Sequence, residues 1–170
     1  ASENTALGHA ALGSNQTGVE NVAVGERALH TGNGVNYSTA VGRAALIGAS
    51  GDYNTAIGWK AGYAVTTGTE NVVLGAGAGE KITTGNYNVC VGYVSGAHAV
   101  YLATGSGNVI IGDFADVSAA DTDYANVIGY NVTGAGGYTT VGRDAEDIRA
   151  AHGTATWAAV SDQRYKKDIV

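Results

Sequence analysis

The sequence predicts an all-β protein: a parallel β-solenoid (β-roll or β-helix) of about nine coils, each of roughly 17 residues. Three observations predict this fold. A five-residue unit, such as Asn-Val-Val-Leu-Gly at 71–75, returns at nearly constant spacing, and the residue three places after its glycine is almost always small. The 170 residues include 27 glycines and one phenylalanine but no proline or methionine. Side chains this small give a thin core, which suits coils that pack mainly on their neighbours.

The five-residue unit predicts one short strand and one corner in each coil. Its middle residues are mostly β-branched or aliphatic, as strands prefer, and its final glycine suits a tight corner. We call these glycines the anchor glycines, and we expect them to lie in register along residues 1–143. They are Gly8, Gly25, Gly42, Gly58, Gly75, Gly92, Gly112, Gly129 and Gly142.

Three further columns recur with the anchor glycines. The asparagine that opens the unit predicts a ladder of amide hydrogen bonds along the rod, formed by Asn4, Asn21, Asn54, Asn71, Asn88, Asn108 and Asn126. The small residues three places after the anchor are expected to point into the core: Ala11, Ala28, Ala45, Ala61, Ala78, Ser95, Ala115 and Ala145. The next position changes from leucine to glycine, which predicts a change of cross-section partway along: Leu12, Leu29, Leu46, Gly62, Gly79 and Gly96.

Regularity decreases after Gly92. Longer or irregular segments at 93–107 and 113–125 predict loops on one face, where solenoids often bind their partners. Residues 144–151 read as a short helix with an aspartate at its start and Gly153 beyond its end. We therefore expect a helical connecting segment over 144–160, followed by a different region at 161–170.

Composition excludes some functions. The formal charge of -6 and the pI near 5.0 disfavour nucleic acid as a partner. Cys90 is the single cysteine, so no intrachain disulfide can form, and its Val-Cys-Val setting predicts a small buried side chain. No apolar run has transmembrane length, and no signal peptide opens the chain. Because it does not begin with methionine, we expect a fragment of a longer fibre.

Exposed aromatic residues are the candidate ligand-binding residues. Trp59, Tyr93 and Tyr130 directly follow anchor glycines, and Tyr101 and Phe114 lie in the irregular segments. Aromatic faces suit stacking on sugar rings, although packing or interface cover is the alternative role. A second column precedes the ladder asparagines and contains Glu20, Tyr37, Tyr53, Glu70 and Tyr87.

Neither metal nor cofactor binding is predicted. The acidic run of Asp113, Asp116, Asp121 and Asp123 lacks calcium-loop spacing and is interpreted as a solvated face. The four histidines are scattered without ligand spacing. No set of carboxylates or nucleophiles suggests catalysis on a substrate, so we expect no enzyme.

The repeat resembles the head repeats of trimeric autotransporter adhesins over residues 4–142. In that family each chain winds a left-handed parallel β-roll, and three rolls pack side by side. The units here are longer than the family's usual fourteen residues. The resemblance implies a homotrimer, since a lone thin rod would be only marginally stable; an intertwined triple β-helix is the structural alternative.

The stretch at 157–169, Trp-Ala-Ala-Val-Ser-Asp-Gln-Arg-Tyr-Lys-Lys-Asp-Ile, resembles the opening of the endosialidase-type intramolecular chaperone domain. That domain trimerises phage tail fibres and tailspikes and then cuts itself off at a Ser-Asp bond. The resemblance implies that Ser161 attacks its own bond to Asp162, assisted by Lys166. The family's domain continues for roughly a hundred residues more, and this chain stops at Val170, so we expect no self-cleavage here.

Together these resemblances imply a distal, receptor-binding segment of a bacteriophage tail fibre, located on the virion outside the cell. Its expected partners are two identical chains and a bacterial surface polysaccharide, lipopolysaccharide or outer-membrane protein. A structural spacer, a polysaccharide-degrading tailspike and a bacterial trimeric adhesin head are the alternatives.

Overall fold

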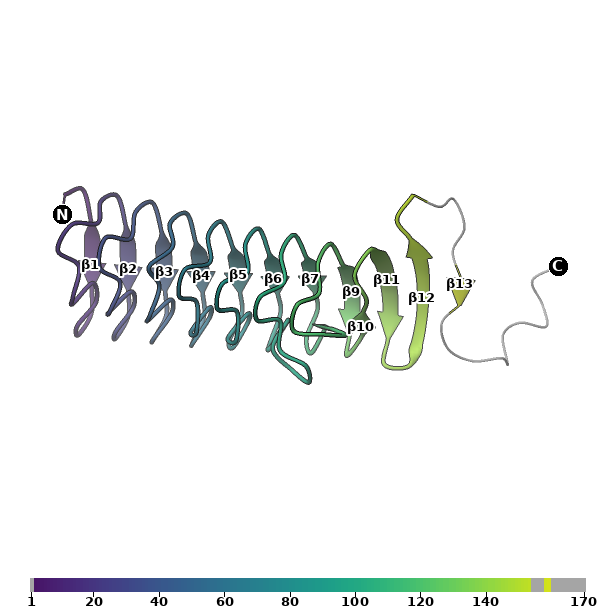
Figure 1. Cartoon of the computed structure of the whole chain (residues 1–170). Helices are drawn as coiled ribbons and strands as arrows, with labels where there is room; N and C mark the ends of the chain where they lie inside the picture. The colour runs from purple at the N-terminus through teal and green to yellow at the C-terminus, as the bar shows by residue number, and fades with distance from the viewer. Residues whose placement is uncertain (1, 154–157, 160–170) are drawn as a thin grey trace.

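The computed structural model describes residues 2–153 and 158–159 and shows a rod built from stacked turns (Figure 1). All the regular structure in these residues is β-sheet, with no helix and therefore none that could span a membrane. One 11-stranded sheet runs along the rod in the order β1-β2-β3-β4-β5-β6-β7-β9-β11-β12-β13. The predicted all-β parallel solenoid is confirmed.

Nine parallel strands, one to a turn, bound about eight turns. They are β1 (Thr5–Leu7), β2 (Val22–Val24), β3 (Thr39–Val41), β4 (Thr55–Ile57), β5 (Val72–Leu74), β6 (Val89–Val91), β7 (Val109–Ile111), β9 (Asn126–Tyr130) and β11 (Tyr138–Arg143). A second, two-stranded sheet pairs β8 (Asp116–Val117) with β10 (Thr133–Gly134).

The anchor glycines lie in register, as predicted. Gly25, Gly58 and Gly75 have φ values of 126°, 139° and 133°, which side-chain-bearing residues rarely adopt. A Cβ atom built on Gly58 would lie 2.4 Å from the carbonyl oxygen of Gly75, one turn further on. The anchors from Gly8 to Gly129 therefore need glycine both for their own backbone and for contact with the next turn.

The core keeps its volume while its residues change. In the early turns an alanine at the strand centre, such as Ala40, accompanies a leucine six residues later, Leu46, and both are fully buried. From β5 the strand centre enlarges to Val73 and Cys90. The later position becomes Gly79 and Gly96, where an added Cβ would lie 2.6 Å from Val73 Cγ1 and 2.8 Å from Cys90 Sγ. A larger side chain at one position thus compensates for a smaller one at the other.

The amide ladder is confirmed over most of the rod. The Nδ2 atoms of Asn71, Asn88 and Asn108 each donate to the Oδ1 atom of the preceding ladder asparagine, at 3.1, 3.1 and 2.9 Å. Each Nδ2 also donates to a carbonyl at the second corner of the following turn, for example that of Gly85. Ser38 occupies one ladder position, and its hydroxyl accepts the N–H of Asn54.

The final copies of the repeat depart from the predicted columns. Ala125, not Asn126, follows Asn108 in the ladder and donates its N–H to Asn108 Oδ1 at 2.8 Å. Asn126 instead pairs with Val109 and directs its amide to Thr139 Oγ1. Ala145 is exposed in a turn, whereas Ala28 to Ala115 in the same predicted column, including Ser95, are fully buried.

The predicted helix at 144–151 is wrong. This segment contains β12 (Glu146–Ala151), which pairs antiparallel with β11 through a two-residue turn that begins at Asp144, with φ 54°. β13 (Ala158–Ala159) then pairs antiparallel with β12. The last parallel strand would otherwise leave a row of unpaired backbone groups at the sheet edge, and pairing them outweighs the weak local helix propensity.

Cys90 is fully buried in the core, as predicted. Burial raises the pKa of its thiol to about 12, with a further contribution from the nearby carboxylate of Asp116. We expect maleimide labelling at pH 8 to be at least about a hundredfold slower in the folded protein than in denaturant, because both access and thiolate are lost. Mass spectrometry of timed samples would measure this, and rapid labelling in native buffer would contradict the burial.

Candidate functional site

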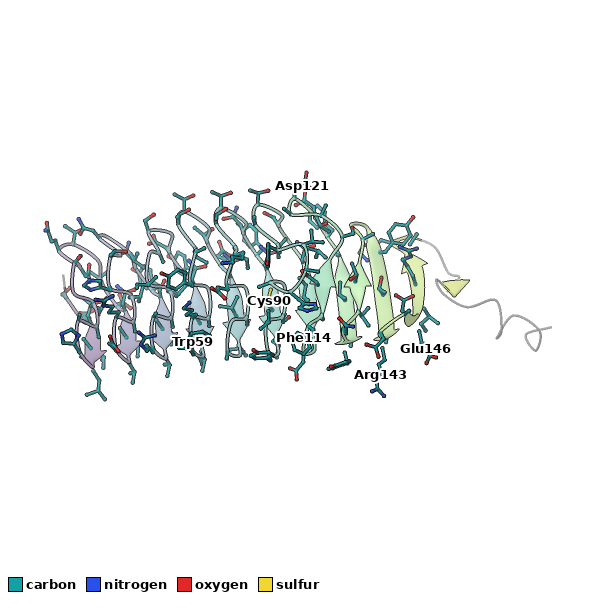
Figure 2. All side chains as sticks on the ribbon, turned by 90° about the horizontal axis from the view of Figure 1, so that it is seen from below. Trp59, Cys90, Phe114, Asp121, Arg143 and Glu146 are labelled. Atoms are coloured by element: carbon teal, nitrogen blue, oxygen red, sulfur yellow. The ribbon has the colours of Figure 1, made fainter. Side chains whose placement is uncertain are left out.

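The two residues after each anchor glycine form a corner that repeats along one side of the rod, and the first of them is exposed in most turns. The second of them usually takes a left-handed conformation, as at Lys60 (φ 54°) and Phe114 (φ 58°). Its N–H donates to the carbonyl of the first corner residue one turn earlier; Phe114 N, for example, lies 2.9 Å from Tyr93 O. Trp59, Phe114 and Arg143 lie along this side, away from Asp121 (Figure 2).

An aromatic cluster covers the corners of consecutive turns near the C-terminal half of the rod. The Phe114 ring lies edge-on to Tyr93, with centroids 5.3 Å apart, and to Tyr130, with centroids 5.9 Å apart. His98 packs on Phe114 at 4.8 Å, and the Arg143 guanidinium lies 5.8 Å from the Tyr130 ring. We call these five residues the Phe114 cluster. Tyr93 and Tyr130 are about half exposed, so their ring surfaces remain accessible.

A buried carboxylate holds the loop that delivers His98 to this cluster. Asp116 is 1% exposed, and its Oδ2 atom accepts N–H bonds from His98, Ala99 and Val100 at 3.1, 2.6 and 3.0 Å. Its Oδ1 atom accepts the N–H of Val117 at 2.8 Å. Several N–H donors to one carboxylate fix a loop firmly. This loop, between β6 and β7, extends beyond the others in Figure 1.

Asp116 corrects the interpretation of the acidic run as a solvated face. Asp116 is buried, whereas Asp113 and Asp123 in the same run are exposed. These two also accept hydrogen bonds: Asp113 accepts the N–H of Tyr93, and Asp123 accepts that of Ser106, each at 2.7 Å. The signal for Asp116 was present in the sequence, since it stands four residues after its anchor glycine. The six preceding turns place a leucine or a glycine there. A charged residue in an inward column indicates a dedicated set of hydrogen-bond donors.

Trp59 and Tyr101, the other predicted ligand-binding residues, make their contacts elsewhere. Trp59 is 48% exposed, and Lys60 Nζ lies 4.8 Å from its ring and 5.1 Å from that of Tyr63. Tyr101 lies at the end of the 97–101 loop with φ 65°, and Lys81 Nζ is 5.9 Å from its ring. The structure thus gathers three of the five predicted residues, Tyr93, Phe114 and Tyr130.

The outer side of the parallel strands forms a second surface of distinct chemistry. The first and third residues of β2 to β7 point away from the core, since only the middle residue of each strand is buried. These outward residues are valine, leucine, isoleucine and threonine, with no charged residue among them. We call this surface the strand face. Ile57 and Ile111 on it are 45% and 39% exposed.

A self-cleavage site and a metal site remain without structural support. Ser161, Asp162 and Lys166 lie outside the residues that the structure describes. Within residues 2–153 and 158–159, no group of three or more histidine, cysteine or acidic side chains is placed to hold a metal ion.

Comparisons with protein families, with curated proteins and with solved structures give no match to this chain.

Proposed function

We propose that this chain is the distal, receptor-binding segment of a bacteriophage tail fibre, which attaches the virion to the bacterial surface. The Phe114 cluster carries this proposal. Its half-exposed tyrosine rings offer apolar faces for sugar rings, while His98 and Arg143 offer donors for hydroxyl or acidic groups beside them. A surface polysaccharide or lipopolysaccharide is the partner that suits this chemistry best, with an outer-membrane protein as the other candidate.

Rigid support suits the cluster to binding. Its rings stand on corners whose backbones are hydrogen-bonded from turn to turn, and Asp116 holds its loop in place. A preorganised site loses little conformational entropy when it binds. Insertion of extra residues at this one place, in an otherwise regular rod, is typical of a binding face on a solenoid.

Assembly as a homotrimer would complete the function. The strand face is uncharged and partly apolar over successive turns, and such surfaces mark contacts between proteins. In a second copy of the chain the strands have the same spacing, about 4.8 Å. When two strand faces pack together, each strand of one copy can therefore lie opposite a strand of the other along the whole rod. Three copies also present three Phe114 clusters, which raises avidity without requiring a strong single site.

A structural spacer is the second candidate function. The regular ladder and anchor glycines from β1 to β7 favour it, because they stack successive turns in register along the rod. A spacer has no need for exposed rings gathered beside a pinned loop. The tailspike and bacterial adhesin alternatives gain no support from the described residues.

Phe114→Ala and Tyr130→Ala are expected to weaken binding to the receptor polysaccharide at least about tenfold, since each removes stacking surface worth about 1 kcal/mol in each of three copies. Surface plasmon resonance against immobilised lipopolysaccharides and capsular polysaccharides from a panel of bacteria would measure this. Light scattering should show the wild type and both variants at three times the 17.0 kDa chain mass.

Tyr124→Ala is the matched control, because Tyr124 is 66% exposed yet lies over Gly107 on a different column. It should bind like the wild type. An equal loss of polysaccharide binding in all three variants would show that the Phe114 cluster has no special role in binding. Absence of any binding by a correctly assembled wild type would favour the spacer.

A further inference from the structure

The column of residues just before the ladder asparagines forms a second regular surface, away from the Phe114 cluster. Its members share a left-handed backbone, with φ values of 56° at Tyr37, 60° at Tyr53, 57° at Glu70 and 58° at Tyr87. The N–H of each donates to a carbonyl of the preceding turn at 3.1 or 3.2 Å. The side chains therefore leave a fixed backbone at intervals of one turn. All four are exposed.

Two tyrosines of this column already form a stack along the rod. The rings of Tyr37 and Tyr53 lie 4.9 Å apart with an interplanar angle of 5°. This distance matches the spacing of neighbouring strands, about 4.8 Å, so the rings lie roughly across the rod axis. Tyr37 covers one face of the Tyr53 ring. The other face is directed toward the next turn, where the column residue is Glu70.

A surface hollow of about 360 Å³ opens between Tyr53 and Glu70. Among the described residues, no lysine, arginine or histidine forms an ion pair with Glu70. Tyr87 follows Glu70 one turn further on. An unpaired carboxylate thus stands between two tyrosines of one column, beside this hollow.

We propose that Tyr53, Glu70 and Tyr87 bind an organic ammonium group. Cations are attracted to the faces of aromatic rings, and rings that flank a carboxylate suit alkylated ammonium ions. Tyr53 and Tyr87 are two turns apart, about 10 Å, and contacts of about 3.5 to 4 Å to each ring leave room for one trimethylammonium group. The carboxylate of Glu70 neutralises the charge. The ammonium group could belong to a lipid headgroup or to an amino sugar.

Choline is the first probe, and its neutral isostere 3,3-dimethylbutan-1-ol is the test for charge. We expect the full chain to bind choline with a Kd of roughly 1–10 mM by NMR titration, and to bind the isostere at least about tenfold more weakly. Glucosamine distinguishes the two sources of the ammonium group, with neutral N-acetylglucosamine as its own test for charge. Tighter binding of glucosamine than of choline would assign an amino sugar, and the reverse would assign a choline headgroup.

Glu70→Gln, Tyr53→Ala and Tyr87→Ala should each weaken choline binding about tenfold or more. Glu20→Gln is the matched control, since Glu20 has the same backbone conformation (φ 56°) but has a tyrosine, Tyr37, on one side and Glu3 on the other. It should leave the Kd unchanged. Equal binding of the neutral isostere, equal loss in Glu20→Gln, or no binding of either choline or glucosamine by the folded wild type would each overturn the proposal. None of these outcomes depends on the Phe114 cluster.

Discussion

Replacing Gly58 by alanine is expected to cost the rod at least about 3 kcal/mol of its free energy of unfolding. With φ at 139°, an alanine at this position adopts a backbone conformation that costs about 1–3 kcal/mol by itself. Its Cβ atom would also lie 2.4 Å from Gly75 O and 2.6 Å from Gly75 C. Both atoms belong to backbone that is hydrogen-bonded to neighbouring turns. Relief of the clash must therefore separate two turns at the middle of the rod.

Urea or guanidinium denaturation followed by circular dichroism would measure this loss. Gly48→Ala provides the control, because the nearest atom to its added Cβ is Val65 O at 3.7 Å and its φ is not positive. It should cost less than about 1 kcal/mol. Should Gly58→Ala retain the wild-type midpoint, the stacking of anchor glycines would not be the constraint that the repeat indicates.

The period of the fold could be predicted because its strictest requirement is local and repeated. Only glycine tolerates the anchor conformation, so the same residue must recur in every turn, and its spacing reports the length of the coil. The Asn column is readable for a related reason. A buried amide must satisfy both its donors and its acceptor, and an identical residue one turn away does so repeatedly.

The end of the rod could not be predicted in the same way. Between Gly129 and Gly142 the interval is shorter than one regular coil, so position along the unit no longer fixes position in space. Ala145, which follows this short interval, enters a turn. Asn126 leaves the ladder for a related reason: its unit lacks one residue, so Ala125, not Asn126, stands four places before Gly129. The strand β12 depends on a neighbour, the open edge of β11, that no local pattern encodes. Helix propensity over 144–151 consequently gave the wrong structure.

The candidate site also combines positions that the sequence predicts with contacts that depend on the folded chain. Tyr93 and Tyr130 belong to one column and their shared side was readable from spacing, whereas the interaction of Phe114 with His98 depends on the fold of an inserted loop. That loop is set by Asp116, whose bonds to three successive N–H groups follow from its inward position. Spacing alone placed Trp59 on the same column. It could not show that Trp59 has a separate neighbour in Lys60, which also contacts the Tyr63 ring and pairs with Glu80.

Replacing Asn71 by alanine is expected to lower the free energy of unfolding of the rod by about 3–5 kcal/mol. The substitution removes the two bonds that Nδ2 donates, to Asn54 Oδ1 and Gly85 O at 3.1 and 2.9 Å. It also removes the two that Oδ1 accepts, from the N and Nδ2 atoms of Asn88 at 3.0 and 3.1 Å. These partners are buried, and each buried polar group left unsatisfied costs about 1–3 kcal/mol.

Asn71→Ser is the informative comparison, because the chain already contains a serine in this column. Ser38 Oγ accepts the N–H of Asn54 at 3.1 Å, so a hydroxyl can satisfy the next turn while it leaves the amide's other bonds unmade. The serine variant should therefore lose less stability than the alanine variant, by about 1 kcal/mol or more in the same denaturation experiment. If serine and alanine were equally destabilising, hydrogen bonding along the column could not explain the loss. Cavity formation beside Asn54 and Asn88 would then be the dominant cost.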